Sequence, residues 1–138
     1  MARSTRYMAL DVGEKRIGVA MADTAVLIAF PHSTIQVDGT EYATIASLIQ
    51  NEKIDTVVVG YPRSQSGSQT QQTTAIEAFT MKLKSTGVVC AYQDESVTSI
   101  QAEQRLKAQK KPYSKGDIDA MAATIILQDY LEANHGRI

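Results

Sequence analysis

The sequence holds a single cysteine, Cys90, among its 138 residues. One cysteine excludes an internal disulfide bond and a cysteine-rich zinc site. No apolar run approaches the ~18 residues that a membrane-spanning helix requires. The N-terminal segment has only a short apolar stretch at residues 7–10, below the ~7–15 residues of a signal-peptide core. We therefore expect a soluble, cytoplasmic protein that makes no contact with a membrane.

Charge of one sign is not in excess either. The chain carries 14 Lys and Arg residues against 15 Asp and Glu residues, which gives a formal net charge of −1. A global positive field, which would indicate a nucleic-acid partner, is therefore absent. Charge is concentrated locally instead, because five basic residues and no acidic residue lie between Arg105 and Lys115.

Length and composition are those of an ordinary globular protein. Hydrophobic residues make up 43% of the chain and charged residues 21%, which argues against wholesale disorder. The length falls within the usual ~100–200 residues of one domain, which is enough to bury a core. Residues 1–138 are expected to form a single domain.

The hydrophobic pattern indicates a mixed α/β fold. Short runs rich in β-branched residues predict strands, and apolar residues at three- and four-residue spacing predict amphipathic helices. The predicted strands cover residues 7–11, 17–22, 33–37, 56–60 and 88–92. The predicted helices cover residues 41–52, about 76–83, 98–108 and 114–132. This order predicts a mixed sheet, in which an antiparallel hairpin edge continues into parallel strands flanked by helices.

Acidic residues occupy three distinctive places in this predicted fold. Asp11 ends the first strand, and Asp94 and Glu95 follow the last strand at its carboxyl end, where open α/β sheets bind their ligands. Asp119 heads the apolar stripe of the last helix, so its carboxylate is expected to point toward the sheet. A buried carboxylate needs a partner, and no Arg or Lys on that helix face offers one.

Carboxylates that meet at one end of a sheet repel each other, which raises their pKa values or requires a cation. Their oxygens select Mg²⁺ or Mn²⁺, and two such ions ~4 Å apart are a common arrangement for phosphodiester hydrolysis. Plainer interpretations also exist: Asp11 suits a turn, and Glu95 suits a solvated strand end. Asp117 is explained by a capping box with Ser114 rather than by chemistry.

Several basic residues are candidates to bind a phosphate backbone. Lys15 and Arg16 lie within a few residues of Asp11 at the predicted hairpin tip, where a base in contact with phosphate would be useful. Lys110 and Lys111 belong to the basic run, which is also consistent with a solvated connector. Arg63 is the only charged residue in a segment of Ser, Gln and Thr that spans residues 61–75.

Four segments closely resemble the motif blocks of one protein family. They are ALDVGEKRIGVA at 9–20, VVVGYPRSQSGS at 57–68, DESVTSIQAE at 94–103 and DIDAMAATIILQDYL at 117–131. The resemblance is to the YqgF-type family of ribonuclease H-like bacterial proteins, which are described as Holliday-junction resolvases and as pre-16S ribosomal RNA nucleases. It implies a ribonuclease H-like fold and a catalytic triad of Asp11, Glu95 and Asp119.

The chain departs from the family pattern at two places. Ser96 and Val97 stand where the family commonly has an arginine after the acidic pair. The second block lacks an Asn and an Asp of the family pattern. These changes leave the triad intact and remove groups that would hold a substrate, so Arg63 is a candidate to replace part of that contact.

The leading hypothesis is a metal-dependent nuclease that acts on structured RNA, in the 5′-end maturation of precursor 16S ribosomal RNA. One alternative keeps the chemistry and replaces the substrate with a branched DNA junction. Another is a non-catalytic RNA-binding assembly factor on the same fold. A sugar-kinase or actin-type nucleotide binder needs two such lobes, and 138 residues hold one. No sustained dimerisation stripe is visible, so we expect a monomer or a weak homodimer.

Overall fold

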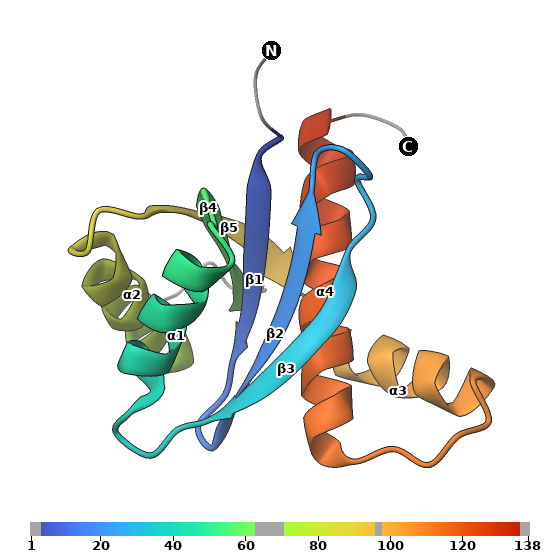
Figure 1. Ribbon diagram of the computed structural model, residues 1–138. Coiled ribbons are helices and arrows are strands. Elements are labelled where there is room, and N and C mark those ends of the chain that lie inside the picture. Colours follow the sequence, from blue (N-terminus) through green and yellow to red (C-terminus); the bar gives the residue numbers. More distant parts are fainter. Residues whose placement is uncertain (1–3, 63–70, 96–97, 136–138) are drawn as a thin grey trace.

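The computed structural model describes residues 4–62, 71–95 and 98–135. In this part of the chain the strands are β1 (Arg6–Val12), β2 (Arg16–Asp23), β3 (Phe30–Gln36), β4 (Thr56–Pro62) and β5 (Val89–Glu95). The helices are α1 (Glu41–Asn51), α2 (Gln71–Lys84), α3 (Thr98–Ala108) and α4 (Lys115–His135). The strands form one sheet in the order β3-β2-β1-β4-β5 (Figure 1).

The sheet combines antiparallel and parallel pairing, as the sequence predicted. β2 runs antiparallel to both β1 and β3, and a tight turn joins β1 to β2, in which the Gly13 N–H donates to the Arg16 carbonyl over 3.0 Å. β4 pairs parallel with β1, and β5 pairs parallel with β4. The carboxyl ends of β1, β4 and β5 therefore meet at one edge of the sheet.

Helices cover both faces of the sheet (Figure 1). On one face, Ile45 of α1 and Phe79 of α2 are buried in a core with Met8 and Leu10 of β1. On the other face lies α4, with α3 packed against it. Of the helices in the described ranges, none combines the length and the apolar character needed to cross a bilayer.

The face under α4 is lined by small side chains. Ala9, Ala20 and Val58 are fully buried there together with Ile126 and Leu127 of the helix. Small residues let a helix approach a sheet closely, since the interior is packed without voids. The long helix therefore lies against the hairpin and β4 at short range.

The predicted elements occur in the predicted order, and the largest differences in strand bounds are at the start of β3 and the end of β5. β3 begins earlier than predicted, because its first residues continue the ladder with β2 as far as Met21. β5 ends later than predicted, because Asp94 and Glu95 pair with Tyr61 and Pro62 of β4. The two acidic residues therefore lie within the strand, and not after it as expected.

The start of α4 is fixed by the predicted capping box. The Ser114 N–H donates to Oδ2 of Asp117 over 2.9 Å, and the Asp117 N–H donates to Oγ of Ser114 over 3.2 Å. This reciprocal pair satisfies two backbone donors at the helix start. It confirms the structural role of Asp117 and sets the position of the first turns of α4, where Asp119 lies.

Candidate active site

Asp11 and Glu95 approach each other from strands that are not neighbours in the sheet. Met8 and Leu10 face α1 and α2, whereas Ala9 faces α4, so alternation along β1 puts Asp11 on the α4 face. Glu95 ends β5 on the same face, and the two side chains share a hydrogen bond.

Gly60 explains how this pair can form across an intervening strand. It lies in β4, between β1 and β5. A Cβ at this position would overlap Oε2 of Glu95 and come within 2.7 Å of Cδ1 of Ile126. Because glycine leaves this space open, the Glu95 side chain can cross β4 and reach Asp11.

The pair is half-buried, and its two carboxylates repel each other. Burial raises the pKa of Asp11 to about 7, with further contributions from repulsion by Glu95 and Asp119 and from the hydrogen bond to Glu95. Burial also raises the pKa of Glu95, while the hydrogen bond from Asp11 works against that rise. Two carboxylates so close together cannot both be charged at low cost.

Asp119 is brought to the same region by α4. Its backbone lies against Gly18, where a Cβ would overlap the Asp119 carbonyl oxygen, and Gly18 is the cross-strand partner of Asp11. Nε of Arg16 donates to Oδ2 of Asp119 over 2.6 Å. The sequence predicted that Asp119 needs a partner and that its own helix face carries no Arg or Lys; the partner comes from β2 instead.

The three carboxylates do not form a ready-made metal site. Across residues 4–62, 71–95 and 98–135, no three His, Cys, Asp or Glu side chains are grouped so as to hold a metal ion. Asp11 and Glu95 are in contact, but the Asp119 carboxylate is bonded to Arg16. The structure thus brings the predicted acids to one region, and their catalytic role stays a prediction.

The alternation of side chains along β5 also separates Glu95 from Asp94. The position of the two residues in the sequence did not decide which of them faces Asp11. Neighbouring residues of a strand point to opposite faces, so Asp94 points to the face covered by α1 and α2. Its side chain is exposed, whereas that of Glu95 is partly buried against the α4 side. Only Glu95 can meet Asp11, in agreement with the residue chosen from the family motif.

The predicted phosphate-binding residues lie in different places. Lys15 is exposed at the turn between β1 and β2, while Arg16 is engaged by Asp119. Lys110 and Lys111 lie exposed between α3 and α4. Arg63 lies outside the described residues.

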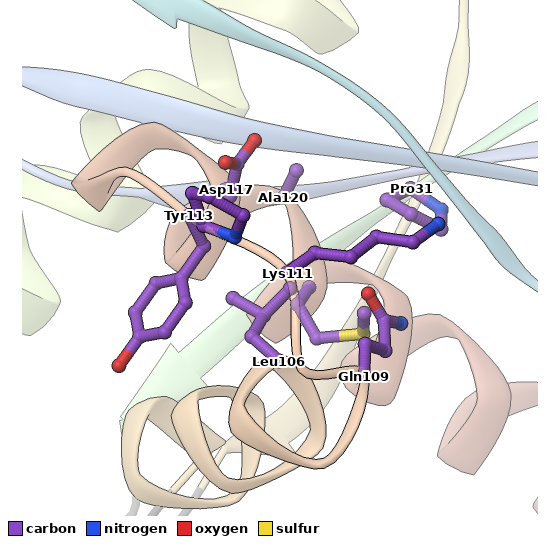
Figure 2. A pocket seen from close by; sticks show the side chains of 9 residues that line it. Pro31, Leu106, Gln109, Lys111, Tyr113, Asp117 and Ala120 are labelled. Atoms are coloured by element: carbon purple, nitrogen blue, oxygen red, sulfur yellow. The ribbon is translucent and has the colours of Figure 1, made fainter.

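Lys111 borders a pocket of about 250 Å³ between α3, α4 and β3. Figure 2 shows its side chain extending across this pocket toward Pro31, with Tyr113 and Asp117 on the opposite side. The lysine is therefore on the same side of the molecule as the first turns of α4.

A second, larger cavity went unrecognised in the sequence. It measures about 850 Å³ and lies between the turn that follows β1 and the start of α2. Val12 and Glu14 line it on one side, and Gln71 and Gln72 on the other. The sequence feature that pointed to this cavity is the Ser-, Gln- and Thr-rich segment. Its last residues begin α2 and place amide groups beside β1, the strand that carries Asp11.

A family model described as "RuvX: Holliday junction resolvase" matches residues 5–133. The chain belongs to the RuvX family. This confirms the resemblance found in the sequence, since RuvX and YqgF denote the same family. Membership of the RuvX family makes the chain a nuclease, a hydrolase that acts on phosphodiester bonds.

RuvX relatives match over most of their length. Proteins provisionally named pre-16S rRNA nuclease from Chloroflexus aurantiacus and from a Picosynechococcus species are both 42% identical to this chain. The first match spans 132 residues and covers 91% of this chain and 86% of the relative. The second spans 130 residues and covers 91% and 90%.

The fold of this RuvX protein is similar to that of Thermus thermophilus RuvC in complex with a Holliday junction substrate. The TM-score is 0.58 at 16% identity, and the match covers 96% of this chain and 97% of that chain. This likeness confirms the predicted ribonuclease H-like mixed sheet flanked by helices.

Proposed function

We propose that this RuvX protein is a metal-dependent nuclease that matures the 5′ end of precursor 16S ribosomal RNA. The half-buried pair of Asp11 and Glu95, with Asp119 beside it, is the observation that carries the proposal. A protein gains nothing in stability from gathering three acids in a partly buried place, so such a cluster points to function.

The residues present fit a divalent cation. All the side-chain donors are carboxylate oxygens, which suit Mg²⁺ or Mn²⁺, and a cation would relieve the repulsion that now raises the pKa of Asp11. Asp11, Glu95 and Asp119 would hold the metal. The expectation from the sequence is that two metal ions bind there. Bound there, the metal would activate a water molecule and offset charge on the phosphate.

The chain's own residues would orient the substrate. Lys15, exposed at the turn after β1, is placed to contact a phosphate next to Asp11. Arg16 lies beside Asp119 and is a second candidate. Lys110 and Lys111 would hold the backbone further away, and Arg63 remains part of the proposal from the sequence alone.

The large cavity beside the β1–β2 turn is lined by Val12 and therefore opens on the face of the sheet opposite to Asp11. A nucleic-acid strand held there would pass around the end of the sheet to reach the acids. Gln71 and Gln72 at the start of α2 offer neutral amide groups, which donate to phosphate and to base edges alike. A path lined by amides suits a substrate recognised by structure rather than by net charge, in keeping with the chain's charge of −1.

The names of the relatives favour ribosomal RNA as the substrate, whereas the RuvX family description favours a branched DNA junction. Both present the same phosphates to the same acids. We take RNA as the substrate and make the junction an outcome of the test. The proposal also includes a cytoplasmic site of action, a single nuclease domain over residues 1–138, and a monomeric or weakly dimeric state.

The test uses Glu95→Gln and Asp94→Asn, because these neighbouring acids point to opposite faces of β5. Purified protein is incubated with precursor 16S ribosomal RNA fragments and with a four-way DNA junction, each with and without Mg²⁺ or Mn²⁺. We expect metal-dependent cleavage of RNA that Glu95→Gln abolishes and Asp94→Asn retains. Cleavage of the junction alone would transfer the proposal to DNA, and binding without any cleavage would support an assembly factor.

A further inference from the structure

The ion pair between Arg16 and Asp119 joins parts of the chain that lie far apart in sequence. Arg16 begins β2 and Asp119 lies near the start of α4, and Nε donates to Oδ2 over 2.6 Å. The side chains are 31% and 24% exposed. Arg16 and Gly18 share one face of β2, so the guanidinium lies beside the point where the helix backbone meets the sheet.

The three acids have different partners in the metal-free structure. The side chains of Asp11 and Glu95 share a hydrogen bond. Asp119 is balanced by a guanidinium, which keeps its positive charge throughout the physiological pH range. A metal ion that binds all three carboxylates must therefore displace the Arg16 side chain from Asp119.

We propose that Arg16 is a built-in counter-ion, which occupies the Asp119 carboxylate until a divalent metal binds there and is then released to contact a phosphate of the nucleic acid. This inference rests on the proposed function and adds to it a coupling between metal and substrate. Ion pairs exposed to this degree are held weakly, so a divalent ion can displace the guanidinium.

Release of Arg16 has a consequence for the order of binding. With the metal absent, the guanidinium is engaged and is a poor phosphate ligand. With the metal bound, it is free and lies next to the reacting phosphate. Coupling of this kind is reciprocal, so substrate that binds Arg16 also raises the affinity for the metal.

The first test measures Mn²⁺ and Mg²⁺ affinity by titration calorimetry on wild-type protein, Arg16→Gln and Lys15→Gln. Both variants lose one positive charge at neighbouring positions, but only Arg16 bonds to Asp119. Removal of a competing counter-ion should tighten metal binding by about three- to tenfold relative to Lys15→Gln. Equal or weaker binding by Arg16→Gln would overturn the proposal.

The second test follows the wild-type side chain directly, so it does not depend on a variant that folds well. The Nε–H signal of Arg16 is identified in NMR spectra by its loss in Arg16→Lys. Bonded to a carboxylate, this proton should exchange slowly with water in the metal-free protein. Saturating Mg²⁺ should shift the signal and speed its exchange, and an unchanged signal would contradict the proposal.

Different results would contradict the metal-dependent nuclease function and the counter-ion role of Arg16. If neither metal binds wild-type protein or Arg16→Gln, the metal-dependent function fails and the counter-ion role falls with it. If metal binds the wild type and the Arg16 signal does not respond, only the counter-ion role is wrong. The nuclease proposal would then stand without it.

Discussion

The backbone of Gly18 in β2 lies against the carbonyl group of Asp119 in α4, with no room for a side chain between them. Gly18 is also the cross-strand partner of Asp11. One glycine therefore sets the distance between the hairpin that carries Asp11 and the helix that carries Asp119.

Replacing this glycine should move the helix. In Gly18→Ala, the Cβ would overlap backbone atoms that cannot turn aside, so we expect a loss on the order of 3 kcal/mol in the free energy of unfolding. Urea denaturation measures the loss, and cleavage should fall with it. Gly116→Ala is the control, because its Cβ would meet only side-chain atoms, of Thr34 at 3.3 Å and of Ser114 at 3.6 Å. Equal stability of the two variants would contradict the packing argument.

Without metal, the protein should become less stable as the pH rises from about 4 to about 7. The pKa of Asp11 is 3.8 ordinarily and is raised to about 7 by burial and by repulsion from Glu95 and Asp119. Between these values the folded protein keeps a proton that the unfolded chain has released, so a rise in pH favours unfolding. The loss is at most about 4 kcal/mol.

Urea denaturation across this pH range checks the expectation in wild-type protein and in Asp11→Asn. The variant cannot ionise at position 11, so its stability should fall much less as the pH rises. The same decline in both proteins would mean that another group causes it.

Metal should stabilise the wild type far more than Asp119→Asn. At about 100 times its dissociation constant, a ligand adds about 2.7 kcal/mol to the folded state. Without metal, Asp119→Asn should differ from wild type by less than about 1 kcal/mol, since relief of repulsion offsets the lost ion pair with Arg16. The measurement is the melting temperature of both proteins with and without Mg²⁺ or Mn²⁺. An equal rise in the wild type and in Asp119→Asn would exclude Asp119 from the metal site.

Replacing Lys110 and Lys111 together by Ala should weaken nucleic-acid binding about equally across sequences. Both side chains are exposed, and contacts to phosphate carry no sequence information. The slope of log affinity against log salt should flatten by up to about 2. Lys15→Ala, next to the acids, should instead lower the single-turnover cleavage rate more than the affinity. An unchanged salt slope in the double variant would make the basic run a solvated connector.

The order of strands and helices could be predicted because each element carries its own periodic pattern. Asp11 and Asp119 could be found for a related reason, since one ends an apolar strand and the other heads an apolar stripe. Strand ends were less certain: Asp94 and Glu95 belong to β5 through pairing with β4, and pairing partners are not visible in a local pattern.

Contacts between distant elements could not be predicted. The bond from Arg16 to Asp119 depends on how closely α4 approaches β2, and Gly18 decides that approach. The reach of Glu95 to Asp11 depends on a missing side chain at Gly60 in the strand between them. In both cases a glycine within the sheet, Gly18 or Gly60, determines which charged groups meet, and a single sequence gives no sign of it.

Under the proposed triad, the placement of Asp119 on α4 also determines when the site is complete during synthesis of the chain. The hairpin with Asp11 leaves the ribosome first, but its alanine-lined face stays uncovered until α4 has been translated and has docked on it. A nascent chain that stops before this helix holds at most two of the three acids. With the proposed triad, the growing polypeptide therefore has no complete cleavage centre until α4 has folded.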